Sequence, residues 1–215
     1  MRVVLGPRIE SEGSGALGDV VQALCGAEGE KVSLSRAGVA DLSRPLTRAE
    51  VALLRQALVG GGRMPSAASP AGTDSLVGYI CQGAGLSSGL SSCGTCVVAV
   101  TDHANLTWQS PLTGPNDDEA GPRFPSMTDI YEPGVVQERL GTLGGIIVKP
   151  GVVAGVGDDG RLNAYETETS QACGHLAVSS ELVPVVIVAA HMGLRVAAAV
   201  VITGTQDEET GSGRS

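Results

Sequence analysis

Residues 102–133 read DHANLTWQSPLTGPNDDEAGPRFPSMTDIYEP, and this stretch decides how the rest of the chain is interpreted. It is too polar and too rich in proline and glycine to form one helix or one strand. It is also long for a connection inside a compact domain, where long ordered loops usually have a function. It contains Trp108 and Phe124, the only tryptophan and the only phenylalanine of the chain. Large apolar side chains in a polar loop indicate a pocket wall, and the alternative is a disordered linker.

The composition is that of a folded domain without a basic surface. Of the 215 residues, 42% are hydrophobic and only 2% are aromatic, so valine, alanine and leucine must build the core. The formal net charge is −9 and no tract is basic, which makes nucleic acid and anionic membranes poor partners. The sequence shows no secretory leader and no uninterrupted apolar run of membrane-spanning length, so a cytoplasmic protein is expected.

The cysteine pattern favours reduced thiols. The chain has five cysteines, an odd number without a secreted context. Cys93-Gly94-Thr95-Cys96 could be half of a zinc site or a redox pair, but no second C-x-x-C accompanies it. Zinc sites need more ligands than this pair supplies, so we expect no metal, and the role of Cys93 and Cys96 stays open.

Hydrophobic periodicity and turn residues predict an α/β domain over residues 1–204, followed by a disordered polar tail at 205–215. The expected strands are 2–5, 31–35, 76–80, 97–100, 146–148, 152–154, 175–180 and 197–203. The expected helices are 17–24, 46–59 with Thr47 as its cap, one starting at 133, one capped by Asn163, and one from 184 that stops at Gly193. Strands 146–148 and 152–154 are expected to form a hairpin around Pro150-Gly151.

Three ordered blocks of the opening stretch resemble the trimeric, low-molecular-mass class of purine nucleoside phosphorylases. That family carries D-H-x-N-L, then G-P-N-D, then R-F-P-x-M-S/T-D-x-Y, which stand here at 102–106, 114–117 and 123–131. Residues 184–196, PVVIVAAHMGLRV, are similar to the family's P-E-V-I-V-A-R-H-x-G-L-R-V. The resemblance implies a mixed central β-sheet flanked by helices, no cofactor, and a homotrimer in which Phe124 reaches the neighbouring subunit's site.

The resemblance also implies which residues bind the substrates. Ser14, in a Gly/Ser loop that leads into a helix and can present N–H groups to phosphate, and Arg36 would bind phosphate. Arg36 could equally be a solvated surface residue. The glycine-containing segment 81–86 matches a purine-contacting turn. The residues assigned to the purine are Gly83, Ala84, Tyr165, Glu166 and Ser180.

Glu166 is the residue assigned to catalysis. Tyr165-Glu166-Thr167 resembles the family's F-E-T, in which the aromatic ring stacks on the purine and the carboxylate accepts from the base N1–H. Such a bond selects 6-oxopurines, because adenine has no donor at N1. The alternative is that Glu166 and Glu168 are helix-start charges.

The implied activity is that of a purine-salvage glycosyltransferase, in which phosphate cleaves a 6-oxopurine nucleoside to free base and ribose 1-phosphate. Two departures from the family weigh against it. Gly204 stands where the family has the asparagine that bonds the purine N7, and Glu181 stands where a second serine contacts phosphate. The alternatives are therefore a catalytically impaired nucleoside-binding relative, or a methylthioadenosine phosphorylase, which Glu166 disfavours.

Overall fold

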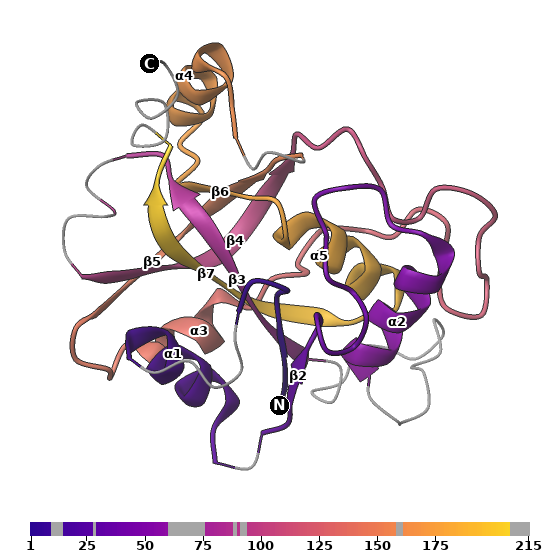
Figure 1. Ribbon diagram of the computed structural model, residues 1–215, viewed down its shortest axis with the longest axis horizontal. Coiled ribbons are helices and arrows are strands. Elements are labelled where there is room, and N and C mark those ends of the chain that lie inside the picture. Colours follow the sequence, from indigo (N-terminus) through magenta and orange to yellow (C-terminus); the bar gives the residue numbers. More distant parts are fainter. Residues whose placement is uncertain are drawn as a thin grey trace.

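The protein forms a mixed sheet with helices on both faces (Figure 1). The computed structural model describes residues 1–9, 15–27, 29–59, 76–87, 90, 94–157 and 161–206. The strands are β1 (Arg2–Leu5), β2 (Lys31–Ser33), β3 (Leu76–Gly85), β4 (Thr95–Asn105), β5 (Ile146–Gly155), β6 (Ala177–Ser179) and β7 (Arg195–Thr205). The helices are α1 (Ala16–Cys25), α2 (Arg48–Val59), α3 (Pro133–Leu140), α4 (Ala164–Ala172) and α5 (Leu182–His191). The expected fold class is confirmed.

Five of the strands close on one another. The hydrogen-bonded order is β2-β1-β3-β6-β5-β4-β7, and β7 pairs again with β3, so that β3, β6, β5, β4 and β7 form a ring. Within the ring, β3–β6 and β4–β7 are antiparallel and the other pairs are parallel. Strands β1 and β2 extend the sheet outward from β3, both in parallel.

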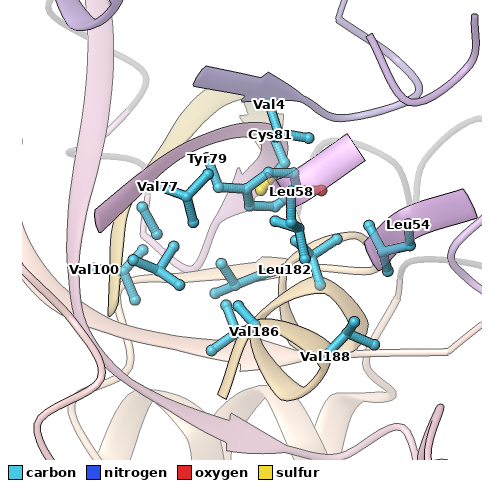
Figure 2. Packing of buried hydrophobic residues seen from close by; sticks show 14 of the residues in the cluster. Val4, Leu54, Leu58, Val77, Tyr79, Cys81, Val100, Leu182, Val186 and Val188 are labelled. Carbon is cyan, nitrogen blue, oxygen red and sulfur yellow. The ribbon is translucent and has the colours of Figure 1, made fainter. Parts of the chain in front are cut away.

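Alternating side chains of the strands supply the two larger hydrophobic cores of the described residues. Along β4, Val98 and Val100 face α2 and α5, whereas Val97 and Ala99 face α1 and α3. Figure 1 shows the two helix pairs on opposite sides of the strands. In Figure 2, side chains of α2 and α5 point toward Tyr79 and its neighbours in β3. The period of two along the strands therefore fixes which face each helix covers.

Helix α5 confirms the prediction made from its sequence. It is apolar all round, and eight of its ten residues are buried, as expected of a helix inside a core. It ends in a Schellman motif. Gly193 has φ +70°, its N–H bonds the carbonyl of Ala190 at 3.0 Å, and the N–H of Leu194 bonds the carbonyl of Ala189 at 2.9 Å.

The hairpin expected around Pro150-Gly151 is wrong. Residues Ile146–Gly155 form the single strand β5, which runs parallel to β4, with Pro150 opposite Ala99. The register shifts between Val100 and Asp102, so β4 carries one extra residue beside the Pro-Gly pair. A bulge in the partner strand accommodates a proline that cannot donate a ladder bond.

Two strands are longer than expected. The turn predicted at 81–86 is wrong, because Cys81–Gly85 continue strand β3. Strand β7 pairs with them as far as Thr205. Strand β4 likewise continues through Asp102 to Asn105, so the irregular loop occupies residues 106–132. Thr205 lies in β7, the N–H of Gln206 bonds the carbonyl of Gly85, and the rest of the expected tail lies outside the described residues. Within the described part of the chain, no helix is long and apolar enough to cross a membrane.

Candidate functional site

The long loop is held at its two ends by one side-chain pair. Tyr131, at the end of the loop, and His103, in β4, share a hydrogen bond of 2.8 Å between the Tyr131 hydroxyl and Nδ1. Their rings meet edge to face at 5.8 Å. Burial lowers the pKa of His103 and raises that of Tyr131. Asp102 accepts the N–H of His103 at 2.7 Å. The D-H pair thus shapes the base of the loop.

A second network fixes the middle of the loop against α2 and α5. Arg55 Nη1 donates to Asp117 Oδ2 at 2.5 Å, and Arg55 Nη2 lies 3.4 Å from His191 Nδ1. His191 Nε2 lies 3.1 Å from Asn116 Oδ1. Burial, and then the charge of Arg55, lower the pKa of His191, so the neutral ring accepts from Arg55 and donates to Asn116. A Cβ on Gly121 would lie 1.6 Å from the His191 carbonyl oxygen, so this contact requires glycine.

These contacts give the G-P-N-D block a structural role. Asn116 and Asp117 join the loop to α2 and to the end of α5. A surface cavity of about 430 Å³ lies beside this junction, lined by residues of the 46–55 and 111–117 segments. None of the residues assigned to the purine or to phosphate lines this cavity, so it is not the assigned site.

The aromatic side chains expected to form a pocket wall point into solvent in the single chain. Trp108 is 93% exposed and has φ +56°, and Phe124 is 85% exposed. Tyr165, at the start of α4, is 77% exposed. The only ring contact described for Phe124 is the guanidinium of Arg123, 5.8 Å from the ring centroid. All three rings are therefore accessible to a ligand or to a second copy of the chain.

The ends of β3, β6 and β7 bring part of the expected purine site together. Ala84 pairs with Val178 of β6 and with Gly204 of β7. The register shifts between Gly83 and Ala84, and a Cβ on Gly83 would lie 2.5 Å from the carbonyl oxygen of Val178. Ser180 follows β6 directly, and its buried Oγ has no hydrogen-bond partner among the described residues. Gly83, Ala84 and Ser180 thus lie at one end of the ring.

Glu166 is held by the start of its own helix. Its Oε2 accepts the N–H of Asn163 at 2.9 Å, and its N–H donates to Asn163 Oδ1 at 2.9 Å, which together form a capping box. Helix α4 is tied to the ring through Gln171, whose Nε2 donates to the carbonyl of Leu86 at 2.5 Å. Glu168 is exposed. The capping role expected for Asn163 is confirmed.

The two expected phosphate ligands are not brought together in the described residues. Ser14 lies outside them, as does Cys93. Arg36 is exposed, in the turn after β2. A cation that sequence reasoning did not assign, Arg8, follows β1 and lies beside the end of the ring. Its Nε lies 3.3 Å from Oε1 of Glu181. Sequence reasoning missed Arg8, because nothing local to Pro7-Arg8 connects it with a residue so far along the chain.

Glu181 is a buried carboxylate at the start of α5. Its side chain is 3% exposed, and burial raises its pKa to about 7 against the smaller, opposite effect of Arg8. Within the described part of the chain, neither oxygen has a hydrogen bond of standard geometry. The N–H groups of Gln82 and Arg8 lie close enough to oppose the rise in pKa slightly. A helix N-terminus favours a negative charge, but here desolvation dominates.

Two side chains fix the backbone of Glu181, from which the carboxylate extends. The Tyr79 hydroxyl donates to the Glu181 carbonyl at 3.1 Å, and the N–H of Glu181 donates to Ser179 Oγ at 3.2 Å. A Cβ on Gly6 would lie 2.3 Å from Glu181 Oε2. The end of β1 therefore has room for this carboxylate only because residue 6 is glycine.

Comparisons with known proteins agree on one family. The model of the "Phosphorylase superfamily" matches residues 85–214, more than half of the chain. Purine nucleoside phosphorylase 1 of Bacillus subtilis is 33% identical over 102 residues, which are 46% of this chain and 38% of that protein. The counterpart from Geobacillus stearothermophilus is 36% identical over 107 residues, 46% of this chain and 37% of that protein. The chain thus matches less than two fifths of the length of these relatives.

A mammalian relative and a solved structure fit the same picture. Purine nucleoside phosphorylase of Bos taurus is 33% identical over 107 residues, 46% of this chain and 37% of that protein. The crystal structure of Schistosoma mansoni purine nucleoside phosphorylase in complex with inosine superposes with a TM-score of 0.53 at 23% identity, over 66% of this chain and 52% of that one. The structural likeness bears on the fold, and it confirms the mixed sheet with flanking helices expected from the sequence.

Proposed function

The chain belongs to the phosphorylase superfamily, and we propose that it cleaves the N-glycosidic bond of 6-oxopurine nucleosides with inorganic phosphate. The observation that carries the proposal is the family match over residues 85–214, which includes the whole of α4 and Ser180 but begins after Gly83 and Ala84. The relatives that the chain resembles are purine nucleoside phosphorylases. The related solved structure holds inosine, which supports a purine nucleoside as the substrate class.

The reaction requires little covalent chemistry from the protein. A phosphate oxygen attacks C1′ of the ribose as the C1′–N9 bond breaks, and the electron pair of that bond leaves with the purine, which takes up a proton. The transition state has oxocarbenium character, as in glycoside cleavage. Catalysis then consists of holding phosphate below the sugar and stabilising the charge that develops on the base. Neither step calls for a metal or an organic cofactor.

The proposed purine contacts come from α4 and the end of the ring. Tyr165 stacks on the base, Glu166 accepts from N1–H, and the backbone at Gly83 and Ala84 lies along the purine edge with Ser180 beside it. The capping box is compatible with this role. A carboxylate offers about four lone-pair sites on two oxygens, so Glu166 can keep the bond from Asn163 to Oε2 and accept from the purine with Oε1.

The proposed phosphate contacts are Ser14 and Arg36. The support for Ser14 is chemical, because a Gly/Ser loop before a helix can present N–H groups to an anion. Arg36 is exposed, so it would have to turn toward the phosphate when the anion binds. A guanidinium can contact phosphate with two parallel hydrogen bonds.

The proposed assembly is a homotrimer in which Phe124 contacts the neighbouring subunit's nucleoside. The support is the 85% exposure of the Phe124 ring in a loop that is otherwise fixed at both ends and in the middle. Light scattering at micromolar concentration should give three times the mass of the chain. A stable monomer would contradict the assembly. Cytoplasmic location and a role in purine salvage stay predictions.

The activity is tested by incubating the protein with inosine, with and without phosphate, and separating the products. Release of hypoxanthine and ribose 1-phosphate only when phosphate is present is the expected result. The absence of turnover at micromolar enzyme, in the presence of both substrates, would refute the proposal.

A second candidate, a nucleoside-binding relative without activity, is favoured by Gly204 and Glu181. Loss of one transition-state donor costs roughly 10²–10³ in rate, and Gly204 has no side chain to donate. Calorimetry with inosine, guanosine and phosphate separates the candidates, because binding without turnover supports the second. A methylthioadenosine phosphorylase would instead release adenine from methylthioadenosine, which Glu166 disfavours.

A further inference from the structure

Among the described residues, the turn between β6 and α5 holds buried polar atoms without a hydrogen bond of standard geometry. Ser180 Oγ and both carboxylate oxygens of Glu181 are inaccessible to solvent and lack hydrogen bonds of standard geometry. Glu181 Oε1 has only the ion pair with Arg8, at 3.3 Å. Buried polar groups are almost always hydrogen-bonded, so three such atoms on adjacent residues call for an explanation. A ligand that both donates and accepts would satisfy them.

The position of this group fits an anion. Glu181 directly precedes α5, a helix of ten residues whose first N–H groups lack partners within the helix. The end of β1 approaches the carboxylate at Gly6, and Arg8 lies beside it. The sequence resemblance aligns Glu181 with a serine that contacts phosphate. A carboxylate therefore stands at the place where phosphate is expected.

The charged and titratable groups around the carboxylate come from three segments. Arg8, after β1, is the cation, and it also faces Asp41, whose pKa its charge helps to lower. Tyr79 and Cys81 face Glu181 from β3, and the pKa of each is raised by burial and then by neighbouring charge. Both stay neutral at physiological pH. One half-exposed arginine is therefore the only full charge that offsets Glu181 among the residues described here.

We propose that the protonation state of Glu181 decides whether phosphate can bind: the carboxylic acid donates its O–H to a phosphate oxygen, and the carboxylate excludes the anion. This inference rests on the proposed function, since it concerns the phosphate end of the same site. In the neutral form, Glu181 supplies the donor that the aligned serine would have supplied. In the charged form, it repels a phosphate that shares its buried surroundings.

The pH range follows from the burial of the group. Its pKa of about 7 places half of the population in each state near neutrality. Above that pH, each further unit leaves about a tenth as much of the neutral acid, so phosphate affinity falls about tenfold per unit. Phosphate itself titrates in this range, so the effect must be measured as a ratio against a variant that cannot ionise.

The experiment is calorimetry with inorganic phosphate alone at pH 6, 7 and 8, on the protein and on Glu181→Gln. The ratio of the two dissociation constants should rise about tenfold from pH 6 to pH 8. Glu168→Gln, which removes an exposed carboxylate, is the matched control. The ratio of the unaltered protein's phosphate dissociation constant to that of Glu168→Gln should not change with pH. A Glu181→Gln ratio that is also constant with pH would overturn the inference, as would the absence of phosphate binding at pH 6.

Two additions keep the test decisive. Glu181→Ser places a small hydroxyl at the position and should behave as Glu181→Gln does, so it replaces that variant if Glu181→Gln fails to fold. The inosine assay separates this inference from the proposed function. If hypoxanthine is released only with phosphate but the ratio of dissociation constants does not change with pH, only the inference is refuted. If that ratio changes with pH but no hypoxanthine is released, only the proposed activity is refuted.

Discussion

The buried carboxylate of Glu181 should make the stability of the protein depend on pH in a way that one substitution removes. The unfolded chain titrates this group near its ordinary pKa of 4.5, and the folded protein titrates it at about 7. Between these values the folded state holds a proton that the unfolded state has lost, so stability falls as pH rises. Above pH 7 the full penalty applies, and below pH 4.5 it is absent.

The size of the effect follows from the difference between the two pKa values. A shift of one unit corresponds to about 1.4 kcal/mol, so the fully developed penalty is about 3 kcal/mol, of which about 2–3 kcal/mol develops between pH 5 and pH 8. Glu181→Gln keeps the shape and cannot ionise. It loses the contact with Arg8, but that side chain is 56% exposed, and pairs with an exposed partner are worth less than about 1 kcal/mol.

The assay is urea unfolding of the protein and of Glu181→Gln at pH 5, 6, 7 and 8. The variant should be close to the unaltered protein at pH 5 and more stable by about 2–3 kcal/mol at pH 8. Glu168→Gln serves as the control, because its carboxylate is exposed. If the difference between Glu181→Gln and the unaltered protein does not change with pH, Glu181 is not held neutral by burial, and the reasoning is wrong.

Three further substitutions test particular features. Glu166→Gln keeps the capping box but should lower kcat/KM for inosine at least about tenfold, which corresponds to roughly 1.4 kcal/mol. Glu168→Gln is the control and should cost under about 1 kcal/mol. Equal effects of the two substitutions would refute the assignment of Glu166 to the purine base. Gly193→Ala forces alanine to φ +70° and should lower the unfolding free energy by about 1–2 kcal/mol in urea titrations, and an unchanged midpoint would argue against the Schellman motif. Gly121→Ala puts a Cβ 1.6 Å from the His191 carbonyl; a loss of about 1–3 kcal/mol and faster proteolysis of the loop are expected, and unchanged proteolysis would show that the loop is anchored elsewhere.

The parts of the fold that depend on neighbours in sequence could be predicted. Helix α5 was predicted because a continuous apolar run and Gly193 are both local signals. The capping residues Thr47 and Asn163 were predicted for the same reason, and each accepts the expected N–H, from Glu50 at 3.3 Å and from Glu166 at 2.9 Å. Local chemistry decides where these helices begin and end.

The parts of the fold that depend on residues far away in the sequence could not be predicted. Pro150-Gly151 is a strong turn signal, yet it lies in the middle of β5 because β4 bulges beside it. Segment 81–85 has the glycine content of a turn and is a strand because β7 pairs with it. Sequence patterns describe a segment in isolation, and here tertiary pairing overrides them.

The candidate site divides in the same way. Gly83, Ala84 and Ser180 were assigned by resemblance, and the structure brings them to one end of the ring. The hydrogen-bond network of Arg55, Asp117 and His191 could not be predicted from the sequence. Its residues come from α2, the loop and α5, which are far apart along the chain. A motif indicates that residues matter, but the contacts they make depend on residues elsewhere in the chain.

The closed ring also constrains when the chain can fold. Strand β3 pairs with β7 from Leu76 opposite Arg195 to Gly85 opposite Thr205, so the ring stays open until residues 195–205 have left the ribosome. Contacts between segments so far apart form slowly, because the intervening chain must first be ordered. A nascent chain halted before residue 195 should therefore remain sensitive to protease throughout β3, and the transition to resistance should come late and in one step as β7 joins.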